Sequence, residues 1–173
     1  MKKIIFIVGN SGAGKTTYAE ELAKKYDFAL LGEDNFVFKM NPGSMVKRVS
    51  RGNDRKIGMK NLNSVLENYI IEGISIVIEG AFVDGPLYLD DFLKIARKNN
   101  YDFCPIMLVV DRRKSIRRKK KKGYVVPEVI DRRLREAALK LEYPEKCYVF
   151  DTGKQSLKKG LKEIEKIAGL TEA

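Results

Sequence analysis

The feature that most constrains the fold is the stretch GNSGAGKTT at residues 9–17, which contains the full pattern G-x-x-x-x-G-K-[ST]. The preceding run KKIIFIV (2–8) is short, β-branched and almost wholly apolar, as expected for a strand buried on both faces. The following residues, 15–25, carry apolar side chains at helical spacing. A strand, a glycine-rich loop and a helix in this order predict an α/β fold built around a phosphate-binding loop (P-loop).

Each part of this loop has an expected role. The glycines allow backbone N–H groups to turn inward around phosphate oxygens, and the positive end of the following helix faces the same point. Lys15 is expected to reach the β- and γ-phosphates of a nucleotide, and the Thr16 hydroxyl to bind Mg²⁺. The predicted nucleotide-binding residues of the loop are Gly9, Asn10, Ser11, Gly12, Ala13, Gly14, Lys15, Thr16 and Thr17.

The remainder of the chain alternates between strand and helix patterns. Further strands are predicted at 28–32, 75–80, 102–110 and 146–150, and further helices at 59–72, 85–99, 112–122, 127–143 and 156–168. Pro105 is expected to mark an irregular strand start, and the polar, turn-rich stretch 41–58 a mobile insertion. The alternation predicts one domain, residues 1–173, with a parallel sheet covered by helices on both faces.

Composition narrows the class of protein. An apolar content of 44% and a charged content of 33% are typical of a soluble globular protein, and no apolar run approaches a membrane span in length. Cys104 and Cys147 lie in apolar segments and are expected to be buried and reduced, as in a cytoplasmic protein. The sequence contains no histidine, which excludes acid–base chemistry and metal ligation by imidazole.

The net charge of +11 is concentrated in one segment. Residues 112–135 contain twelve Arg or Lys side chains and two acidic ones, and the rest of the chain is close to neutral. A solvated charged helix is the simplest explanation of such a run. An anionic partner, such as a phosphate, a nucleic acid or a membrane surface, is the functional alternative.

Other users of the P-loop are set aside on the sequence. A GTPase should carry the guanine-reading motif N-K-x-D, which is absent from the chain. A motor or helicase ATPase usually needs a larger domain and an acidic pair, whereas the strand at 75–80 ends in the single acid Glu79. A compact phosphotransferase remains. In such an enzyme Glu79 is expected to act on Mg²⁺ or its waters, or alternatively to hydrogen-bond the acceptor.

A second acidic position follows the strand predicted at 28–32. A kinase acting on a hydroxyl needs a carboxylate that orients the nucleophile and accepts its proton. Asp34 in LGEDNF (31–36) is the candidate for this catalytic base, with Glu33 in reserve. The structural alternative for Asp34 is an N-cap, in which its carboxylate accepts a hydrogen bond from the first turn of the next helix.

The whole chain resembles the group of P-loop kinases that includes nucleotide, nucleoside and polynucleotide kinases. The resemblance implies an ATP donor, Mg²⁺, a three-layer fold with five parallel strands, and a mobile basic lid after the fourth strand, here at about 112–126. The stretch RRKKKKGYVVPEVIDRRL (117–134) is similar to the lid region of phage-type 5′-hydroxyl polynucleotide kinases. The stretch GEDNF (32–36) is similar to the acidic pair before an aromatic residue in that family.

On the matching positions, this resemblance gives Asp34 the role of base and Arg117 or Arg118 the role of the first lid arginine. Arg112 or Arg113 and the loop 151–154 are implied to lie near the nucleotide base. The chain departs from the family at two places: Lys121 or Lys122 stands at the second lid arginine, and Val37 replaces an arginine after the acidic pair. A lysine does not provide the planar, bidentate contact of an arginine, so the lid contacts are altered here.

The expected function is therefore that of an ATP-dependent kinase that phosphorylates a hydroxyl, with the 5′-hydroxyl of a nucleic acid as the first candidate acceptor. In that case the basic residues of 41–58 are expected to follow the nucleic-acid backbone. Phosphorylation of a small molecule, such as a nucleoside, nucleotide or other metabolite, remains the alternative. A nucleic-acid-binding module that is regulated by a nucleotide, without turnover, is the third possibility.

Overall fold

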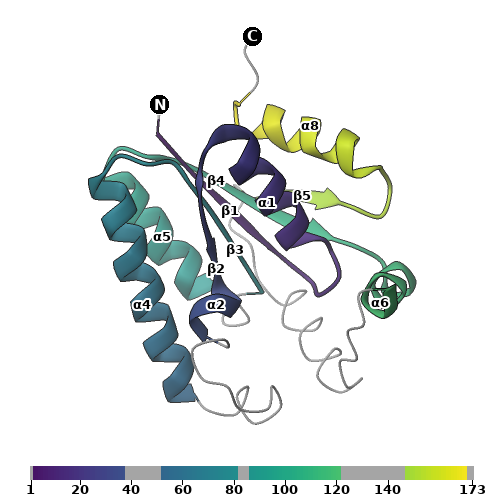
Figure 1. Ribbon diagram of the computed structural model, residues 1–173, viewed down its shortest axis with the longest axis horizontal. Helices are drawn as coiled ribbons and strands as arrows, with labels where there is room; N and C mark the ends of the chain where they lie inside the picture. Colours follow the sequence, from purple (N-terminus) through teal and green to yellow (C-terminus); the bar gives the residue numbers. More distant parts are fainter. Residues whose placement is uncertain (1, 38–51, 82–85, 122–146, 171–173) are drawn as a thin grey trace.

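The computed structural model describes residues 2–37, 52–81, 86–121 and 147–170. Its centre is a sheet of five parallel strands in the order β2-β3-β1-β4-β5 (Figure 1). The strands are β1 Lys3–Gly9, β2 Ala29–Gly32, β3 Ile76–Gly80, β4 Asp102–Val109 and β5 Tyr148–Asp151. The α/β class and the five-stranded parallel sheet are thus confirmed, and the strand that leads into the P-loop is the central one.

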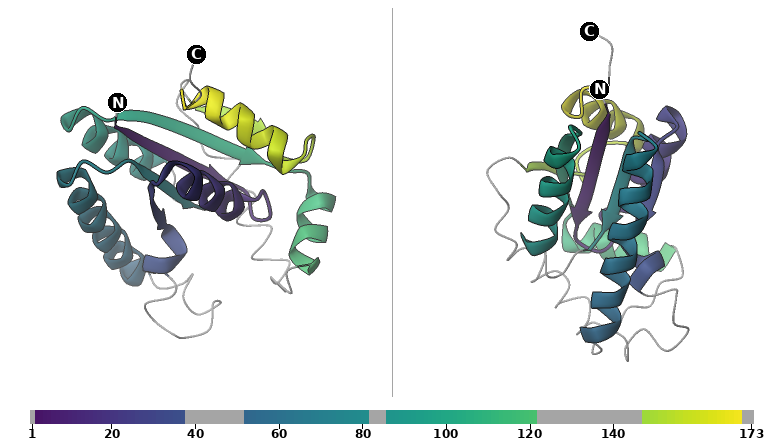
Figure 2. Two further views of the ribbon diagram at one scale, coloured as in Figure 1. Left: turned by 45° about the horizontal axis from the view of Figure 1, so that its top comes forward. Right: turned by 90° about the vertical axis from the view of Figure 1, so that its left-hand side faces the viewer.

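Helices cover both faces of this sheet. The described helices are α1 Lys15–Tyr26, α2 Glu33–Val37, α4 Gly52–Ile71, α5 Pro86–Lys98, α6 Arg112–Lys121 and α8 Leu157–Ile167. Helices α1 and α8 pack on one face and α4 and α5 on the other (Figure 2). Helices α2 and α6 lie beyond the carboxyl ends of β2 and β4 (Figure 1). This is the three-layer arrangement predicted for a parallel sheet covered on both sides.

Strand β1 shows how the sequence produces two separate cores. Ile4 and Phe6 contribute to the core under α4 and α5, whereas Ile5 and Ile7 contribute to the core under α1 and α8. Each of these side chains is at most 1% exposed. Successive side chains of a strand point to opposite faces, so a strand covered on both sides requires a continuous apolar run. Complete burial of each such side chain stabilises the fold by about 1.5–3 kcal/mol.

Helix α4 begins at Gly52 rather than near residue 59, where the sequence predicts a helix. Two glycines and several polar residues make 52–58 look like a turn-rich segment. In the structure Gly58 instead allows a close contact between two helices, because a Cβ there would lie 2.7 Å from the Phe36 carbonyl oxygen. The prediction of an irregular insertion is therefore wrong for 52–58. Its remainder, 41–51, lies outside the described residues.

The interpretation of Pro105 as an irregular strand start is also wrong. Pro105 lies inside β4, in register with Phe6 of β1. Proline cannot donate a backbone hydrogen bond, so it is tolerated where one side of the strand has no ladder partner. The described pairing between β4 and β5 begins at Ile106, one residue further on. Pro105 therefore lies beside β1 but before the first described pair of the β5 ladder.

The remaining elements are close to their predicted bounds. Strand β5 begins at Tyr148 rather than at 146, and Ser156 accepts a hydrogen bond from the Lys159 backbone N–H (3.4 Å) as the N-cap of α8. Helix α6 ends at Lys121, and 122–126 of the expected lid and the helix predicted at 127–143 lie outside the described residues. Among the helices that the structure describes, none is long and apolar enough to cross a membrane.

The two cysteines lie on different faces of the sheet. Cys104 is buried in the core under α1 and α8, whereas Cys147 is half-buried against the core under α4 and α5, and neither forms a disulfide. Burial raises the pKa of the Cys104 thiol to about 11 and that of the Cys147 thiol to about 12. The predicted burial is confirmed for Cys104, and Cys147 is more accessible than expected.

The first and last described elements meet at the amino end of the sheet. Lys3 Nζ forms a salt bridge of 2.7 Å with Asp102 Oδ2, which joins the starts of β1 and β4. Gly169, just after α8, lies against the same lysine, because a Cβ on this glycine would be 3.4 Å from Lys3 Nζ. The start of β1 and the residues just after α8 therefore lie opposite the carboxyl ends of the strands, where the P-loop is found (Figure 1).

Candidate active site

The P-loop follows β1 directly and turns tightly into α1. Gly9 has φ +149°, and a Cβ at this position would overlap the carbonyl oxygen of Leu108 on the neighbouring strand β4. Only glycine therefore fits at the point where the loop leaves the sheet. The backbone N–H of Ala13 donates to the Asn10 carbonyl oxygen (3.1 Å), and the Asn10 side-chain amide donates to the Val110 carbonyl oxygen (3.0 Å). These bonds close the loop and anchor it to the end of β4.

Lys15, the first residue of α1, reaches back across the loop. Its Nζ lies 3.5 Å from the Asn10 carbonyl oxygen. Burial lowers the pKa of Lys15, and the negative charges of Glu79, Asp34 and Glu33, in decreasing order, oppose this effect. These three acids from two other segments are thus close enough to the lysine to act on its charge. Phosphate oxygens would provide the same kind of compensation for the buried ammonium group.

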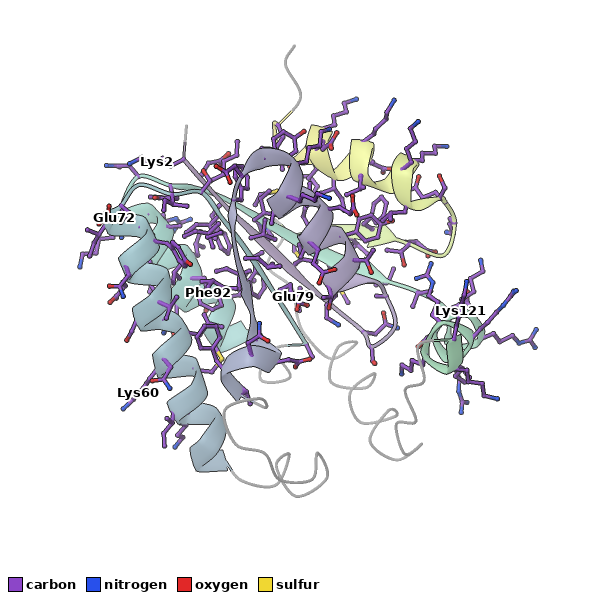
Figure 3. All side chains as sticks on the ribbon, viewed as in Figure 1. Lys2, Lys60, Glu72, Glu79, Phe92 and Lys121 are labelled. Carbon is purple, nitrogen blue, oxygen red and sulfur yellow. The ribbon has the colours of Figure 1, made fainter. Side chains whose placement is uncertain are left out.

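Thr16 and Glu79 form the second contact between segments. Thr16 Oγ1 lies 3.4 Å from Glu79 Oε2, at the end of β3. Glu79 is 8% exposed, and burial raises its pKa, although the charge of Lys15 opposes this shift. Figure 3 shows Glu79 at the end of β3, on the side of the molecule where α2 lies. The sequence predicts both residues as Mg²⁺ contacts, and the structure brings their oxygens together.

The donor set at Thr16 and Glu79 fits a magnesium ion that is bound together with a nucleotide. A hydroxyl and a carboxylate are hard oxygen ligands, and Mg²⁺ is usually held by one or two protein oxygens, substrate phosphates and waters. Across the described ranges no cluster of three or more His, Cys, Asp or Glu is arranged to bind a metal ion by itself. A divalent ion at this site would complete its coordination with phosphate oxygens or waters.

Glu33 and Asp34 lie in the first turn of α2, directly after β2. Glu33 is 1% exposed, whereas the Asp34 side chain is open to solvent. Helix α2 begins at Glu33, so Asp34 lies inside its first turn and not at the residue before it. The N-cap interpretation of Asp34 is therefore wrong. The charges of both carboxylates act on Lys15, that of Asp34 more strongly than that of Glu33.

Asn35 is a site residue that the sequence analysis missed. A Cβ on Gly32 would lie 3.0 Å from Glu79 Oε1 and 3.2 Å from Asn35 Nδ2. Both polar groups therefore lie over the end of β2, beside the magnesium contacts. No sequence motif marks Asn35, because its proximity to Glu79 depends on the pairing of β2 with β3.

Helix α6, where the predicted lid begins, starts on the opposite side of the P-loop from α2. Arg112, Arg117 and Lys121 are exposed on this helix, and Figure 3 shows its basic side chains spreading into solvent around Lys121. Arg118 is different. Its Nη1 donates to the carbonyl oxygens of Gly12 (3.2 Å) and Ala13 (3.5 Å) of the P-loop. Lys122, the alternative second lid position, lies outside the described residues.

Ser115 and Thr152 are two further contacts of the P-loop that the sequence analysis did not identify. Ser115 Oγ on α6 donates to the Ser11 carbonyl oxygen (2.8 Å), and Thr152 Oγ1, just after β5, donates to the Ala13 carbonyl oxygen (2.8 Å). Ser115 is completely buried and Thr152 is 2% exposed. Such residues are recognised by the burial of their hydroxyl groups, and this burial is known only once the fold is known.

A P-loop after the central strand, with acids at the ends of the two strands on one side of it, defines a nucleotide-binding P-loop domain. A family model described as AAA domain (AAA_33) matches residues 4–144, and the chain belongs to this family. No curated protein matches the chain by sequence.

Solved structures of kinases share the fold. A sugar kinase from Janibacter sp. HTCC2649 is 20% identical, with 99% of this chain and 96% of that chain covered and a TM-score of 0.77. A gluconokinase from Sinorhizobium meliloti 1021 is 16% identical, with 97% and 94% covered and a TM-score of 0.69. A chain of the Pnkp1/Rnl/Hen1 RNA repair complex is 16% identical, with 84% and 47% covered and a TM-score of 0.67. The chain therefore has the P-loop kinase fold.

Proposed function

We propose that the protein is an ATP-dependent kinase that transfers the γ-phosphate of ATP to a hydroxyl group of a small molecule. The observation that carries this proposal is the convergence of Lys15, Glu79 and Asp34 at the carboxyl ends of adjacent strands. A phosphate-binding cation, a magnesium ligand and a solvent-open carboxylate are the groups that phosphoryl transfer to a hydroxyl requires.

Each residue has a defined task in this proposal. The P-loop amides and Lys15 bind the β- and γ-phosphates, and Thr16 and Glu79 hold Mg²⁺, which neutralises charge on the phosphates when bound. Asp34 orients the acceptor hydroxyl and accepts its proton. Asp34 is preferred over Glu33 as the base because it is exposed, so that an acceptor can reach it, whereas Glu33 is buried. Arg117 is proposed as the lid arginine that acts on the transferred phosphate.

A small-molecule acceptor is better supported than a nucleic acid. The structures named as a sugar kinase and a gluconokinase match along nearly their whole length, whereas less than half of the RNA-repair chain is covered. The exposed basic residues Arg112, Arg117 and Lys121 lie on α6, across the P-loop from Asp34. They are therefore on the side of β4 and not on the side where the acceptor hydroxyl would meet the base.

Phosphorylation of a nucleic-acid 5′-hydroxyl remains the second candidate, because the RNA-repair chain shares the fold and the sequence resembles the phage-type lid. Five basic residues are expected to follow a nucleic-acid backbone. Lys47, Arg48 and Arg51 lie outside the described residues, whereas Arg55 and Lys56 lie in α4. Neutralising Lys47, Arg48 and Arg51 should flatten the salt dependence of oligonucleotide binding by about one unit of log–log slope per lost phosphate contact. Equal slopes for the two proteins would contradict this second candidate.

An acceptor screen tests the proposed function directly. ATP consumption is measured with Mg²⁺ and separate pools of sugars, sugar acids, nucleosides and 5′-hydroxyl oligonucleotides, and the transferred phosphate is located by mass spectrometry. The proposal predicts transfer to a small-molecule pool that is lost in Asp34→Asn. Transfer to oligonucleotides alone would establish the second candidate, and nucleotide binding without transfer to any pool would favour a binding module.

A further inference from the structure

The side of the P-loop that faces away from the proposed phosphate site is held by three side chains, Ser115, Arg118 and Thr152, which we call the brace. Arg118 Nη1 donates to Thr152 Oγ1 (2.9 Å) and Nη2 to the Thr152 carbonyl oxygen (2.8 Å). Thr152 Oγ1 in turn donates to the Ala13 carbonyl oxygen. Together with the bonds of Ser115 and Arg118 to the loop, the brace engages the carbonyls of three consecutive residues, Ser11, Gly12 and Ala13.

The peptide bond transmits this contact to the phosphate side. In a trans peptide the C=O group and the following N–H group point in opposite directions. Carbonyls of Ser11, Gly12 and Ala13 that are fixed toward the brace therefore direct the N–H groups of the next residues away from it. The N–H of Ala13 already donates a hydrogen bond within the loop, to the Asn10 carbonyl oxygen. The N–H groups of Gly12 and Gly14 are the ones that the brace aims at a phosphate.

The brace is a packed structure and not a loose surface contact. Ser115 and Thr152 are nearly inaccessible to solvent, and a Cβ on Gly12 would lie 2.8 Å from Ser115 Oγ. Helix α6 therefore approaches the loop as closely as a glycine allows. The Thr152 backbone N–H also donates to the Val109 carbonyl oxygen (2.9 Å), which fixes the brace to the end of β4. Buried groups held in this way move only if several hydrogen bonds break together.

We propose that Arg118 is a positioning residue that sets the phosphate-binding shape of the P-loop, and not the lid arginine that acts on the transferred phosphate. Its guanidinium makes four hydrogen bonds behind the loop, to Gly12, Ala13 and both oxygens of Thr152. To act on the transferred phosphate, the guanidinium would have to break all four of these hydrogen bonds. The inference rests on the proposed function, which supplies the phosphate that the loop binds.

The positioning role and the lid role differ in the ligands they affect. A misdirected P-loop binds every polyphosphate less tightly, including ADP, which lacks the phosphate that is transferred. Loss of a lid arginine lowers turnover with ATP but leaves the affinity for ADP nearly unchanged, because its contact is made to the transferred group. ADP and inorganic tripolyphosphate are therefore the appropriate probes, with affinities measured by calorimetry.

The test compares Arg118→Gln, Arg118→Lys and Ser115→Ala with the matched control Lys120→Gln, which removes one exposed charge from the same helix. If the brace acts as proposed, Arg118→Gln should weaken the binding of ADP and of tripolyphosphate by about tenfold each, and Ser115→Ala should weaken it by about threefold. Arg118→Lys should restore part of the affinity, since an ammonium group can donate to some of the same acceptors. Lys120→Gln should change neither affinity by more than about twofold.

A second readout does not depend on any ligand. The ¹H–¹⁵N amide resonances of Gly12, Ala13 and Gly14 are recorded in the free protein. They should move in Arg118→Gln and Ser115→Ala and stay in place in Lys120→Gln, because each follows a carbonyl that the brace engages. If Arg118→Gln does not fold, the amide resonances and affinities of Ser115→Ala and Arg118→Lys are compared with those of Lys120→Gln instead.

The outcomes separate the two proposals. Unchanged ADP affinity and unmoved loop amides in Arg118→Gln, with reduced turnover, would overturn the brace and return Arg118 to the lid role. A wild-type protein that binds ADP but phosphorylates no acceptor would overturn the proposed function. In that case the loss of ADP affinity and the moved loop amides would still support the brace.

Discussion

Thr16 and Glu79 connect the first turn of α1 to the end of β3 through a hydrogen bond of 3.4 Å between their side-chain oxygens. This contact joins the P-loop to the neighbouring strand at the point where Lys15 is also buried. The pairing of β1 with β3 therefore fixes the P-loop and Glu79 relative to each other. Substitutions at this contact should affect catalysis more than folding.

Lys15→Met removes the ammonium group but keeps much of the side-chain volume. Loss of a preorganised charge on the transferred phosphate should raise the barrier by on the order of 3 kcal/mol, or roughly a hundredfold in turnover. The stability of the fold should not fall. Burial lowers the pKa of Lys15, which means that burying its charged form is unfavourable in the free protein. Steady-state kinetics and thermal unfolding measure the two effects, with exposed Lys24→Met on the same helix as the control. Turnover near that of the wild type would contradict the proposed use of the loop.

Asp34→Asn preserves size and removes the base. We expect kcat to fall by roughly a hundredfold or more, with little change in ATP affinity, because Asp34 is proposed to act on the acceptor. Glu33→Gln provides the matched comparison one residue away, and its effect on kcat should be smaller. The kinetics are measured with whichever acceptor the screen identifies. A larger loss of kcat in Glu33→Gln would assign the base to the buried carboxylate.

Gly58→Ala tests whether contact between α4 and α2 positions the base. The added methyl group would lie 2.7 Å from the Phe36 carbonyl oxygen and 3.0 Å from Val37 Cα, so α2 must shift. Alanine favours a helix over glycine by about 1 kcal/mol, while overpacking costs about 1–3 kcal/mol, so stability should fall by about 0–2 kcal/mol. We expect kcat to fall at least about fivefold, with ATP affinity retained.

The control for this substitution is Ser64→Ala, at an exposed position of the same helix where the hydroxyl donates only to Lys60 of the preceding turn (3.1 Å). Kinetics and chemical unfolding are measured on both variants. If Gly58→Ala and Ser64→Ala have the same kcat, then α2 tolerates the displacement and the contact has no catalytic consequence.

Cys104 predicts a pH dependence of stability in the alkaline range. Its pKa rises from 9.0 to about 11 on folding, so the unfolded chain ionises first as the pH increases. The stabilisation is complete below pH 9 and is lost as the pH rises toward 11, with a total of about 2–3 kcal/mol. Urea unfolding of the wild type and Cys104→Ala under reducing conditions at pH 8, 9.5 and 10.5 tests this. The variant should lose less stability over this interval, and parallel losses would contradict the expectation.

Much of the fold is predictable from local patterns. The continuous apolar run before the P-loop identifies the central strand, and the motif itself places Lys15 and Thr16 at the start of a helix. Strands buried on both faces have a strong signal of this kind because nearly all of their buried side chains are apolar. The predicted start of α4 is wrong for the opposite reason. A glycine such as Gly58 locally favours a turn, but in the structure it allows close packing of α4 against α2, and this packing keeps the segment helical.

The candidate site is only partly predictable for a similar reason. Glu79 lies at the end of β3 and Asp34 just after β2, and parallel strands end at the same edge of a sheet, so their meeting is expected from the sequence. Ser115 and Thr152 are not predictable, because their contact with the P-loop arises from the position of β4 beside β1 and of β5 beside β4. The composition of the basic segment also does not distinguish Arg118 from Arg117. Only the contacts show that one turns toward the loop and the other toward solvent.

The meeting of Lys3 and Gly169 at the amino end of the sheet has a practical consequence for handling the protein. A surface linkage, fluorescent label or fusion partner attached near either residue would lie on the side of the molecule opposite Lys15 and Asp34. The same closeness makes a circular permutation feasible in which a short linker joins Lys3 to Gly169 and the chain is opened in a surface connection elsewhere. Such a chain would keep the phosphate loop and its acids within one continuous scaffold.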